Sequence, residues 1–336
     1  NNDKPFDQFV REQIAGDEIR PEDFEYQTAA IFHRLGAVRR NAGNPEIALS
    51  RNEVLTERTN IIGEAFLGLT VGCARCHNHK REPITQKDYY RLQAYLAATQ
   101  EHDIALGPPE EKKAWDSKAA SIRARIAALK KELPTLPEDQ QAQQKQKILT
   151  IAAEQTPPPA TIPGIRNDFE SRTAIHVLRR GVWENKGVAV GPRPLSVLVP
   201  GNMPELETDM TAPRTELARW LTAADHPLTS RVIVNRIWQY HFGTGLVKTA
   251  NDFGTHGDAP SHPELLDWLA KSLTDNDWKL KSLHRLIVTS NIWRQNTRPP
   301  TDEYATADPA NRLLSHFSRR RLSGEEIRDA MLAASG

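Results

Sequence analysis

The chain has 336 residues, of which 38% are hydrophobic and 26% are charged. This length allows two domains with cores of their own, and the composition is that of a globular protein with much polar surface. Lysine plus arginine number 44 and aspartate plus glutamate 43, so the net charge of +1 gives no reason to expect binding to nucleic acid. No apolar run approaches a membrane span, and no G-x-S-x-G, P-loop or dinucleotide fingerprint occurs.

The first hundred residues predict a series of helices. Apolar residues recur at helical spacing over 5–15, 25–35 and about 52–69. Between the second and third helices, 37–48 has the composition of a loop. Gly68 and Gly72 bracket the end of the third helix and allow the backbone to turn. Thr85 and Asp88 resemble a capping box, which predicts a further helix through Leu96.

The only two cysteines lie together in Cys73-Ala-Arg-Cys76-His77. This is C-x-x-C-H, the attachment signature of a c-type haem. Two thiols three residues apart on one helical turn can each add to a vinyl group of one porphyrin, and the histidine that follows becomes an axial ligand of the iron. We therefore interpret Cys73, Cys76 and His77 as a haem c site. Arg75, inside the motif, is a candidate partner for a haem propionate.

Three other interpretations of the motif stay open. A thioredoxin-like redox pair needs a strand before the cysteines, whereas a helical pattern precedes them here. A zinc site would use Cys73, Cys76, His77 and His79, but four ligands within seven residues crowd a tetrahedron. A disulfide across C-x-x-C would close a very short loop and would stabilise the fold little.

The opposite face of a haem iron needs a sixth ligand or an open position. Met203 lies in Pro200-Gly-Asn-Met-Pro204, which resembles the distal Met-Pro loop of small cytochromes c. His33 and His102 lie in the same predicted domain as the motif. These three residues are the candidate sixth ligands, although a lone methionine or histidine is usually not a ligand.

The middle of the chain differs in composition. Residues 108–155 are rich in Ala, Lys, Glu and Gln with apolar residues at helical spacing, which predicts a helical hairpin or coiled-coil insert. The stretch 156–164, TPPPATIPG, reads as a proline-rich linker. Beyond it, 173–178 and 195–199 are short β-like runs that we expect to pair as a small sheet.

The last third predicts helices again, with Ser323 and Glu326 as a second capping box. These helices span 214–223, 230–242, 263–274, 280–293 and 323–334. Four of the tryptophans fall on them and are expected mainly in the core. A polar cluster of His256, Asp258 and His262 has the residue types of a metal or acid–base site, although turn and helix-start roles explain the same residues.

Together these patterns predict a mainly α protein. We expect two helical domains with a helical hairpin or coiled-coil insert and a small β element after the linker. The expected boundaries are 1–107 for the haem-motif domain, 108–155 for the insert, 156–164 for the linker and 165–336 for the C-terminal domain. The chain begins at Asn1 without a signal peptide, so we expect an internal or processed fragment, truncated at the N-terminus of its first domain.

Two stretches of the sequence carry a family resemblance. Residues 5–99, with GLTVGCARCHNHKREPITQKDYYRL, resemble the haem-motif domain of large exported planctomycete-type cytochrome c proteins. Residues 213–336, with PRTELARWLTAADHPLTSRVIVNRIWQYHFGTGLV, resemble the companion C-terminal domain of unknown function. The resemblance implies an exported, haem-associated protein of planctomycetes or related bacteria. Such proteins often have further domains and are usually encoded beside a sulfatase-like partner.

Our leading hypothesis is an exported, periplasmic or extracellular c-type haem protein acting in electron transfer or haem-dependent oxidation. Its cofactor would be haem c, and its partner a redox protein or other domains of a larger exported protein. One alternative is an extracellular binding or scaffold protein with a C-x-x-C disulfide. Another is a metal-dependent hydrolase centred on His256, Asp258 and His262.

Overall fold

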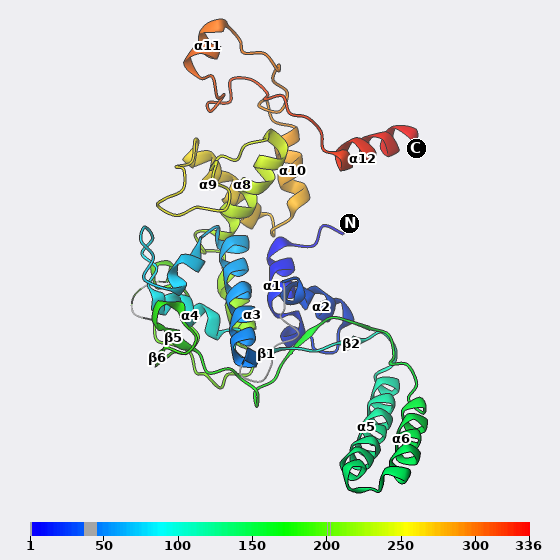
Figure 1. The fold of residues 1–336 in the computed structure, drawn as a ribbon. Coiled ribbons are helices and arrows are strands. Elements are labelled where there is room, and N and C mark those ends of the chain that lie inside the picture. The colour runs from blue at the N-terminus through cyan, green and yellow to red at the C-terminus, as the bar shows by residue number, and fades with distance from the viewer. Residues whose placement is uncertain (1, 37–45, 200, 202) are drawn as a thin grey trace. The chain divides into compact units, whose positions relative to one another are not determined.

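The computed structural model describes residues 2–36, 46–199, 201 and 203–336. It forms two compact units (Figure 1): unit 1 contains residues 1–99 and 167–336, and unit 2 contains residues 100–166. The chain is mainly helical, and its strands form only two-stranded pairs, which confirms the predicted fold class. The division differs from the expected one, because the two sequence regions that flank the insert pack into a single unit. The loop predicted at 37–48 lies mostly outside the described residues.

The first part of unit 1 contains four α-helices with shorter turns between them. They are α1 (Phe6–Ile19), α2 (Phe24–Ala29), α3 (Ile47–Ile62) and α4 (Gln86–Ala94). A 3-10 turn, η1 (Ala30–Arg34), follows α2, and a π-helical turn, η3 (Gly63–Leu67), follows α3. Gly68 ends that turn in the left-handed conformation at φ 59°, as its position predicts. The capping box of Thr85 and Asp88 is confirmed at the start of α4.

The β element of unit 1 is smaller than predicted and pairs differently. Strand β5 (His176–Leu178) runs antiparallel to β6 (Lys186–Ala189), with His176 opposite Ala189. The strand predicted at 195–199 is wrong, because this stretch forms the 3-10 turn η7 (Ser196–Leu198). The Ser196 hydroxyl donates to the Asp88 carboxylate in the capping box of α4. This tertiary contact, and not pairing with another strand, fixes the segment.

The C-terminal part of unit 1 contains the remaining α-helices. They are α7 (Pro213–Leu221), α8 (Thr229–Phe242), α9 (Pro263–Asp275), α10 (Leu280–Val288), α11 (Asp302–Ala307) and α12 (Gly324–Ser335). A core around Trp238 and Phe242 holds α8, α9 and α10 together. Trp268, on α9, is instead 55% exposed, so the expectation that these tryptophans are core residues fails there. The second capping box, at Ser323 and Glu326, is confirmed.

A buried charge cluster joins α1 to α7 within unit 1. Arg214 is fully buried and its guanidinium donates two hydrogen bonds to the Asp17 carboxylate, at 2.6 and 2.7 Å. The Glu18 carboxylate accepts from the backbone N–H groups of Arg214 and Thr215 at the start of α7. A carboxylate at a helix N-terminus satisfies unpaired N–H groups and opposes the positive end of the helix dipole. These contacts explain why residues on either side of the insert share one unit.

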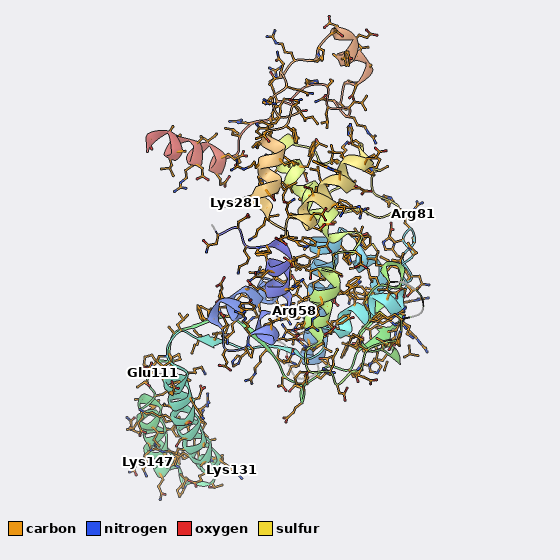
Figure 2. The ribbon with its side chains drawn as sticks, turned by 180° about the vertical axis from the view of Figure 1, so that it is seen from behind. Arg58, Arg81, Glu111, Lys131, Lys147 and Lys281 are labelled. Atoms are coloured by element: carbon orange, nitrogen blue, oxygen red, sulfur yellow. The ribbon has the colours of Figure 1, made fainter. Side chains whose placement is uncertain are left out.

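Unit 2 contains the predicted helical hairpin. Figure 1 shows α5 (Pro109–Glu132) and α6 (Glu138–Ala153) lying side by side, with a short turn between them that includes Pro134. Ala119 and Ile122 are buried between the helices, whereas charged side chains such as Lys131 and Lys147 are drawn on the outer surface in Figure 2. The hairpin is therefore a thin structure with a narrow apolar seam and a polar exterior.

Short strands lie at both ends of the sequence that forms unit 2. They are β1 (Thr99–Glu101), β2 (Ile104–Ala105), β3 (Thr161–Ile162) and β4 (Ile165–Asn167). Strand β2 pairs antiparallel with β3, so Ile104 lies opposite Ile162. The stretch 156–164, expected as a linker between domains, thus contains a paired strand of the insert.

Candidate functional site

The cysteine motif lies on a 3-10 turn, η4 (Val71–Arg75), that follows the left-handed Gly68. Both thiols are free and exposed, whereas Ala74 between them is fully buried and anchors the segment in the core. Cys73 lies within this turn, and Cys76 follows as the residue that ends it. The structure therefore presents both thiols as free, exposed groups at the surface.

Hydrogen bonds from α4 fix the backbone of the motif. The carbonyl oxygen of Arg75 accepts from the Tyr90 hydroxyl at 2.9 Å and from the Gln86 amide at 2.8 Å. The same amide group donates to the carbonyl of Leu178 at the end of β5, at 2.7 Å. Burial raises the pKa of Tyr90 to about 12, so its hydroxyl stays protonated and remains a donor at neutral pH. The scaffold under the two cysteines is thus held from α4 and linked to β5.

His77 is exposed, and its ring is oriented by a backbone carbonyl. Its Nδ1 lies 2.7 Å from the carbonyl oxygen of Asn78. A carbonyl only accepts, so Nδ1 is the donor of this hydrogen bond and Nε2 is the ring nitrogen left to bind a metal. Histidines that bind metals commonly donate their second ring N–H in this way. The arrangement suits coordination of an iron through Nε2.

His79 is occupied by the fold. Its Nδ1 accepts from the backbone N–H groups of Arg81 and Glu82, at 3.2 and 2.9 Å, and its Nε2 lies 3.4 Å from the Thr70 hydroxyl. Both ring nitrogens therefore hold the loop that follows the motif. No group of three or more potential ligands that could hold a metal ion occurs within the described residues. The zinc set of two cysteines, His77 and His79 does not assemble.

The turn between β5 and β6 lies against Cys76. Arg180 and Gly181 have φ values of 55° and 70°, a left-handed pair that glycine favours. A Cβ atom added to Gly181 would lie 2.6 Å from the Cys76 sulfur, so only a glycine allows this approach. Arg75 donates to the Gly181 carbonyl at 3.4 Å, and its Nε is buried without a hydrogen bond. The guanidinium is therefore engaged with this turn, and its contact with a propionate stays a prediction.

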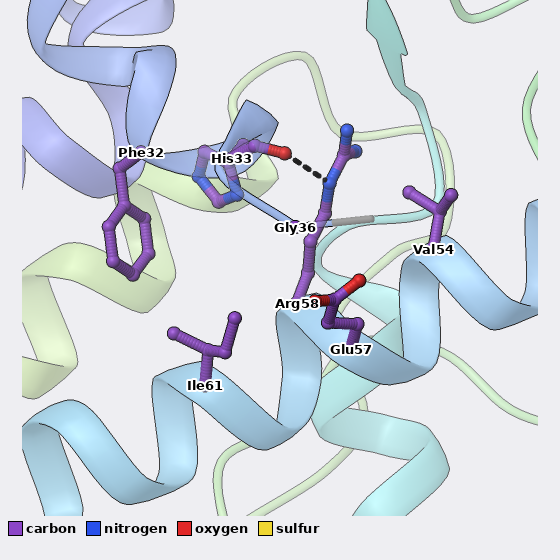
Figure 3. Close-up of a pocket in the computed structure, with 7 residues that line it drawn as sticks. All are labelled: Phe32, His33, Gly36, Val54, Glu57, Arg58 and Ile61. Atoms are coloured by element: carbon purple, nitrogen blue, oxygen red, sulfur yellow. Dashed lines mark hydrogen bonds between the residues drawn. The ribbon is translucent and has the colours of Figure 1, made fainter. Parts of the chain in front are cut away.

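His33 is one of the residues that line a small cavity (Figure 3). It is 3% exposed, its Nε2 lies 2.9 Å from the Ile14 carbonyl, and its own carbonyl accepts from Arg58. Burial, reinforced by the positive charges of Arg214 and Arg58, holds the pKa of His33 well below its usual value. The cavity beside the ring has a volume of about 10 Å³, room for about one water molecule. Among the described residues, His33 is therefore a core residue, and the cavity beside its ring is much smaller than a porphyrin.

The other two candidate ligands, Met203 and His102, lie on other segments of the chain. Met203 is 37% exposed and lies between η7 and α7 in the chain. His102 belongs to unit 2, where burial and the nearby Arg166 and Lys112 lower its pKa. The sixth ligand stays a prediction for both residues.

The cluster predicted at 256–262 divides into separate local roles. His256 has a 67% exposed side chain and lies 3.8 Å from the Asp252 carboxylate. The backbone N–H of Asp258 donates to a threonine hydroxyl, and His262 Nδ1 lies 3.0 Å from the hydroxyl of Ser261 at the start of α9. Because the described residues contain no metal-binding group here, the sequence-based metal centre is not supported by the geometry.

A larger cavity lies beside the loop that follows the motif. Its volume is about 330 Å³, and its walls come from the stretch after η3, from the motif loop, from η7, from Leu228 before α8 and from residues 253–255. Glu82 lines it and is 8% exposed. Sequence reasoning missed this site, because its residues come from five separated stretches and show no local pattern.

Comparison with protein families matches both ends of the chain. Residues 1–101 match PSCyt2, a protein of unknown function (DUF1549), and residues 213–336 match PSD1, a protein of unknown function (DUF1553). These are companion domains of planctomycete cytochrome c proteins. The PSCyt2 match contains α1–α4 and the C-x-x-C-H segment, and the PSD1 match begins at the first residue of α7. Comparison with curated proteins and with solved structures found no match.

The matched regions coincide with the resemblance noted in the sequence. The Arg214 cluster therefore joins the PSCyt2 region to the PSD1 region, because Asp17 lies in the first and Arg214 in the second. Phe253, in the PSD1 region, donates its backbone N–H to the Gly68 carbonyl just before the motif. Within the described residues, every helix is too short or too polar to cross a membrane.

Proposed function

We propose that the chain carries a covalently attached haem c on Cys73 and Cys76, with His77 on the iron. The observation that supports this proposal most is the state of the three side chains. Both thiols are exposed and unbonded, and His77 Nδ1 is held by a carbonyl so that Nε2 is free to coordinate. Thiols that only stabilise a fold are typically buried or paired.

Attachment needs only residues that are already available at the surface. Each thiol adds across one vinyl C=C bond: the sulfur forms an S–C bond, and its hydrogen ends on the neighbouring vinyl carbon. No oxidant is required, because the addition is redox-neutral. His77 Nε2 would bind the iron, and the hydrogen bonds from Tyr90 and Gln86 keep the backbone at Arg75 in place. A bound haem c would supply one-electron redox chemistry.

The exposure of the segment suggests how such a centre would be used. Cys76, His77 and Asn78 are all exposed, so a haem edge held there would be open to a docking protein. We propose electron transfer, or haem-dependent oxidation, with a redox protein or with other domains of a larger protein. Because haem c is attached outside the cytoplasm, the proposal includes export to the periplasm or the cell exterior.

The experiment compares proteins exported in a host with haem-attachment machinery. We expect the wild-type chain to show a Soret band and to keep haem through denaturing electrophoresis. The Cys73→Ser/Cys76→Ser double variant should lose the covalent haem, and His77→Ala should keep the thioethers but change the spectrum. His256→Ala is the matched control and should behave as wild type, because His256 is exposed and lies outside the motif.

A colourless wild-type protein would contradict the proposal. If its mass also shows an oxidised cysteine pair, the scaffold alternative with a C-x-x-C disulfide is favoured.

A further inference from the structure

We propose that the 330 Å³ cavity beside the motif loop binds a small organic ammonium ion with an apolar body. The site is formed by the PSCyt2 region, the PSD1 region and the turn η7 between them, and it is independent of haem attachment. Its volume lies within the range of small-molecule sites, which combine apolar walls with a few polar groups.

The walls of the cavity are mainly apolar. The apolar lining residues are Leu69, Pro83, Ile84, Val197, Leu198, Leu228 and Phe253. Such walls favour an aliphatic or aromatic group, because burying apolar surface contributes about 25 cal/mol per Å². Glu82 and Thr255 supply the polar part of the lining. One carboxylate on an otherwise apolar wall is the feature that selects the ligand.

Glu82 is a buried carboxylate without a positive partner. Its Oε1 accepts from the Thr255 hydroxyl at 3.0 Å and from the backbone N–H of His256 at 3.3 Å. Glu82 is 8% exposed. Within the residues that the structure describes, it forms no ion pair that would compensate its charge. A buried charge is costly unless a charge of opposite sign or a set of hydrogen bonds compensates it. An ammonium group in the cavity would supply the opposite charge and further hydrogen bonds to the Glu82 carboxylate.

The shape of the site is built around this carboxylate. A Cβ atom added to Gly254 would lie 2.4 Å from the Glu82 carboxyl carbon, so the glycine lets the PSD1 backbone close over the side chain. The Thr255 hydroxyl is also within 3.0 Å of the Arg81 carbonyl, and His79 holds the backbone N–H of Glu82. The carboxylate is thus fixed from both matched regions before any ligand binds.

Other ligand classes fit the cavity less well. A divalent metal ion needs several oxygen or nitrogen ligands, and the described residues bring no such group together. An anion would be repelled by Glu82. A neutral apolar molecule would fill the walls but would leave the buried charge without a partner.

The test measures binding of 2-phenylethylammonium and of its neutral analogue 2-phenylethanol to the full chain by calorimetry. We expect the ammonium probe to bind at least about tenfold more tightly, because hydrogen bonds to a buried charge typically contribute that much. Glu82→Gln should abolish this preference. Glu64→Gln, at an exposed glutamate of η3, is the matched control and should keep it.

A second variant covers the case in which Glu82→Gln misfolds. Val197 is 47% exposed at the cavity, so Val197→Trp should narrow the site without disturbing the core and should weaken binding of both probes. Equal affinity of the two probes, an unchanged preference in Glu82→Gln, unchanged binding in Val197→Trp, or no binding of the ammonium probe would each overturn the proposal. Failure of haem attachment would leave the result unchanged, so the two proposals fail separately.

Discussion

Two clusters of chemically active side chains differ in how the fold uses them. Around Arg214, every charged group is buried and paired: Arg214 is fully buried, and Asp17 and Glu18 are 8% and 3% exposed at their side chains. At the C-x-x-C-H segment, Cys73, Cys76 and His77 are exposed, and both thiols are free. The Arg214 cluster stabilises the fold, whereas the fold holds the C-x-x-C-H segment at the surface.

This difference separates structural residues from candidate functional ones. Side chains that a fold requires are buried with their partners, and removing one leaves an uncompensated group. In a segment kept for chemistry, hydrogen bonds instead fix the backbone, and the reactive side-chain atoms stay free. The hydrogen bonds to the Arg75 carbonyl fix the backbone of the cysteine segment in this way. The comparison therefore predicts opposite effects of mutation in the two clusters.

The largest effect is expected at the buried cluster. Arg214→Met removes the guanidinium that pairs with Asp17 and Glu18 and leaves both carboxylates buried, so the free energy of unfolding should fall by about 3–5 kcal/mol. Urea unfolding measures this loss. Arg219→Met, which removes an exposed ion pair with Glu216, is the control and should cost about 0.5 kcal/mol or less. A similar loss of unfolding free energy in Arg214→Met and Arg219→Met would contradict the structural role of the buried cluster.

A pH effect follows from another buried group. His226 is 6% exposed, its Nδ1 accepts from Leu228 and Thr229 at the start of α8, and burial lowers its pKa to about 4. The unfolded state then binds more protons between pH 4 and about 6.5, so stability is fully present above that window and is lost as pH falls through it. The loss should reach about 3 kcal/mol at most.

Stability measured against pH in wild type and His226→Asn tests this effect. The asparagine keeps an acceptor for the helix N-terminus but does not titrate, so the slope should become shallower between pH 4 and 6. His256→Asn, at an exposed ring, should leave the slope as it is. An unchanged slope in His226→Asn would show that His226 is not the residue responsible.

A smaller loss of stability is expected at the N-terminus of α4, the helix whose side chains hydrogen-bond to the motif. Asp88→Ala removes the carboxylate that accepts from the Thr85 backbone and from the Ser196 hydroxyl, so the unfolding free energy should fall by about 1–2 kcal/mol. Thermal unfolding measures the change. Asp116→Ala, which breaks an exposed ion pair with Lys112 in the hairpin, should have much less effect. Equal shifts would mean that the cap contributes little.

The smallest effect on stability is expected at the motif itself. The thiols of Cys73 and Cys76 are exposed and unbonded, so Cys73→Ser and Cys76→Ser should change the unfolding free energy of the haem-free chain by about 0.5 kcal/mol or less. Denaturant unfolding of protein made without haem-attachment machinery measures this. A loss comparable with that of Arg214→Met would make the cysteines structural and would remove the contrast.

Local signals in the sequence were sufficient where a few neighbouring residues decide the structure. The capping boxes at Thr85 and Ser323 and the left-handed turn at Gly68 were all predictable, because each depends on side chains within one turn. The helical hairpin was predictable from its composition and spacing. The candidate haem residues followed from their spacing alone.

The remaining features depend on residues that lie far apart in the sequence. Arg214 and Asp17 are 197 positions apart, so no local pattern indicates their pairing. The stretch 195–199 has the composition of a strand, but Ser196 bonds to Asp88 on α4 and the segment forms a 3-10 turn. Glu82 likewise has no local signature, because its partners come from the loop at 254–256. Tertiary contacts override local preference at each of these places.

The central claim, that both cysteines bind one haem, is tested most directly by tryptic peptide mapping of the exported protein. Trypsin cleaves after Arg75 and separates Cys73 from Cys76. The account predicts that the peptide ending at Arg75 and the peptide beginning at Cys76 are recovered as one species linked through a haem. Two separate peptides with free thiols, or two peptides joined directly by a disulfide, would contradict it.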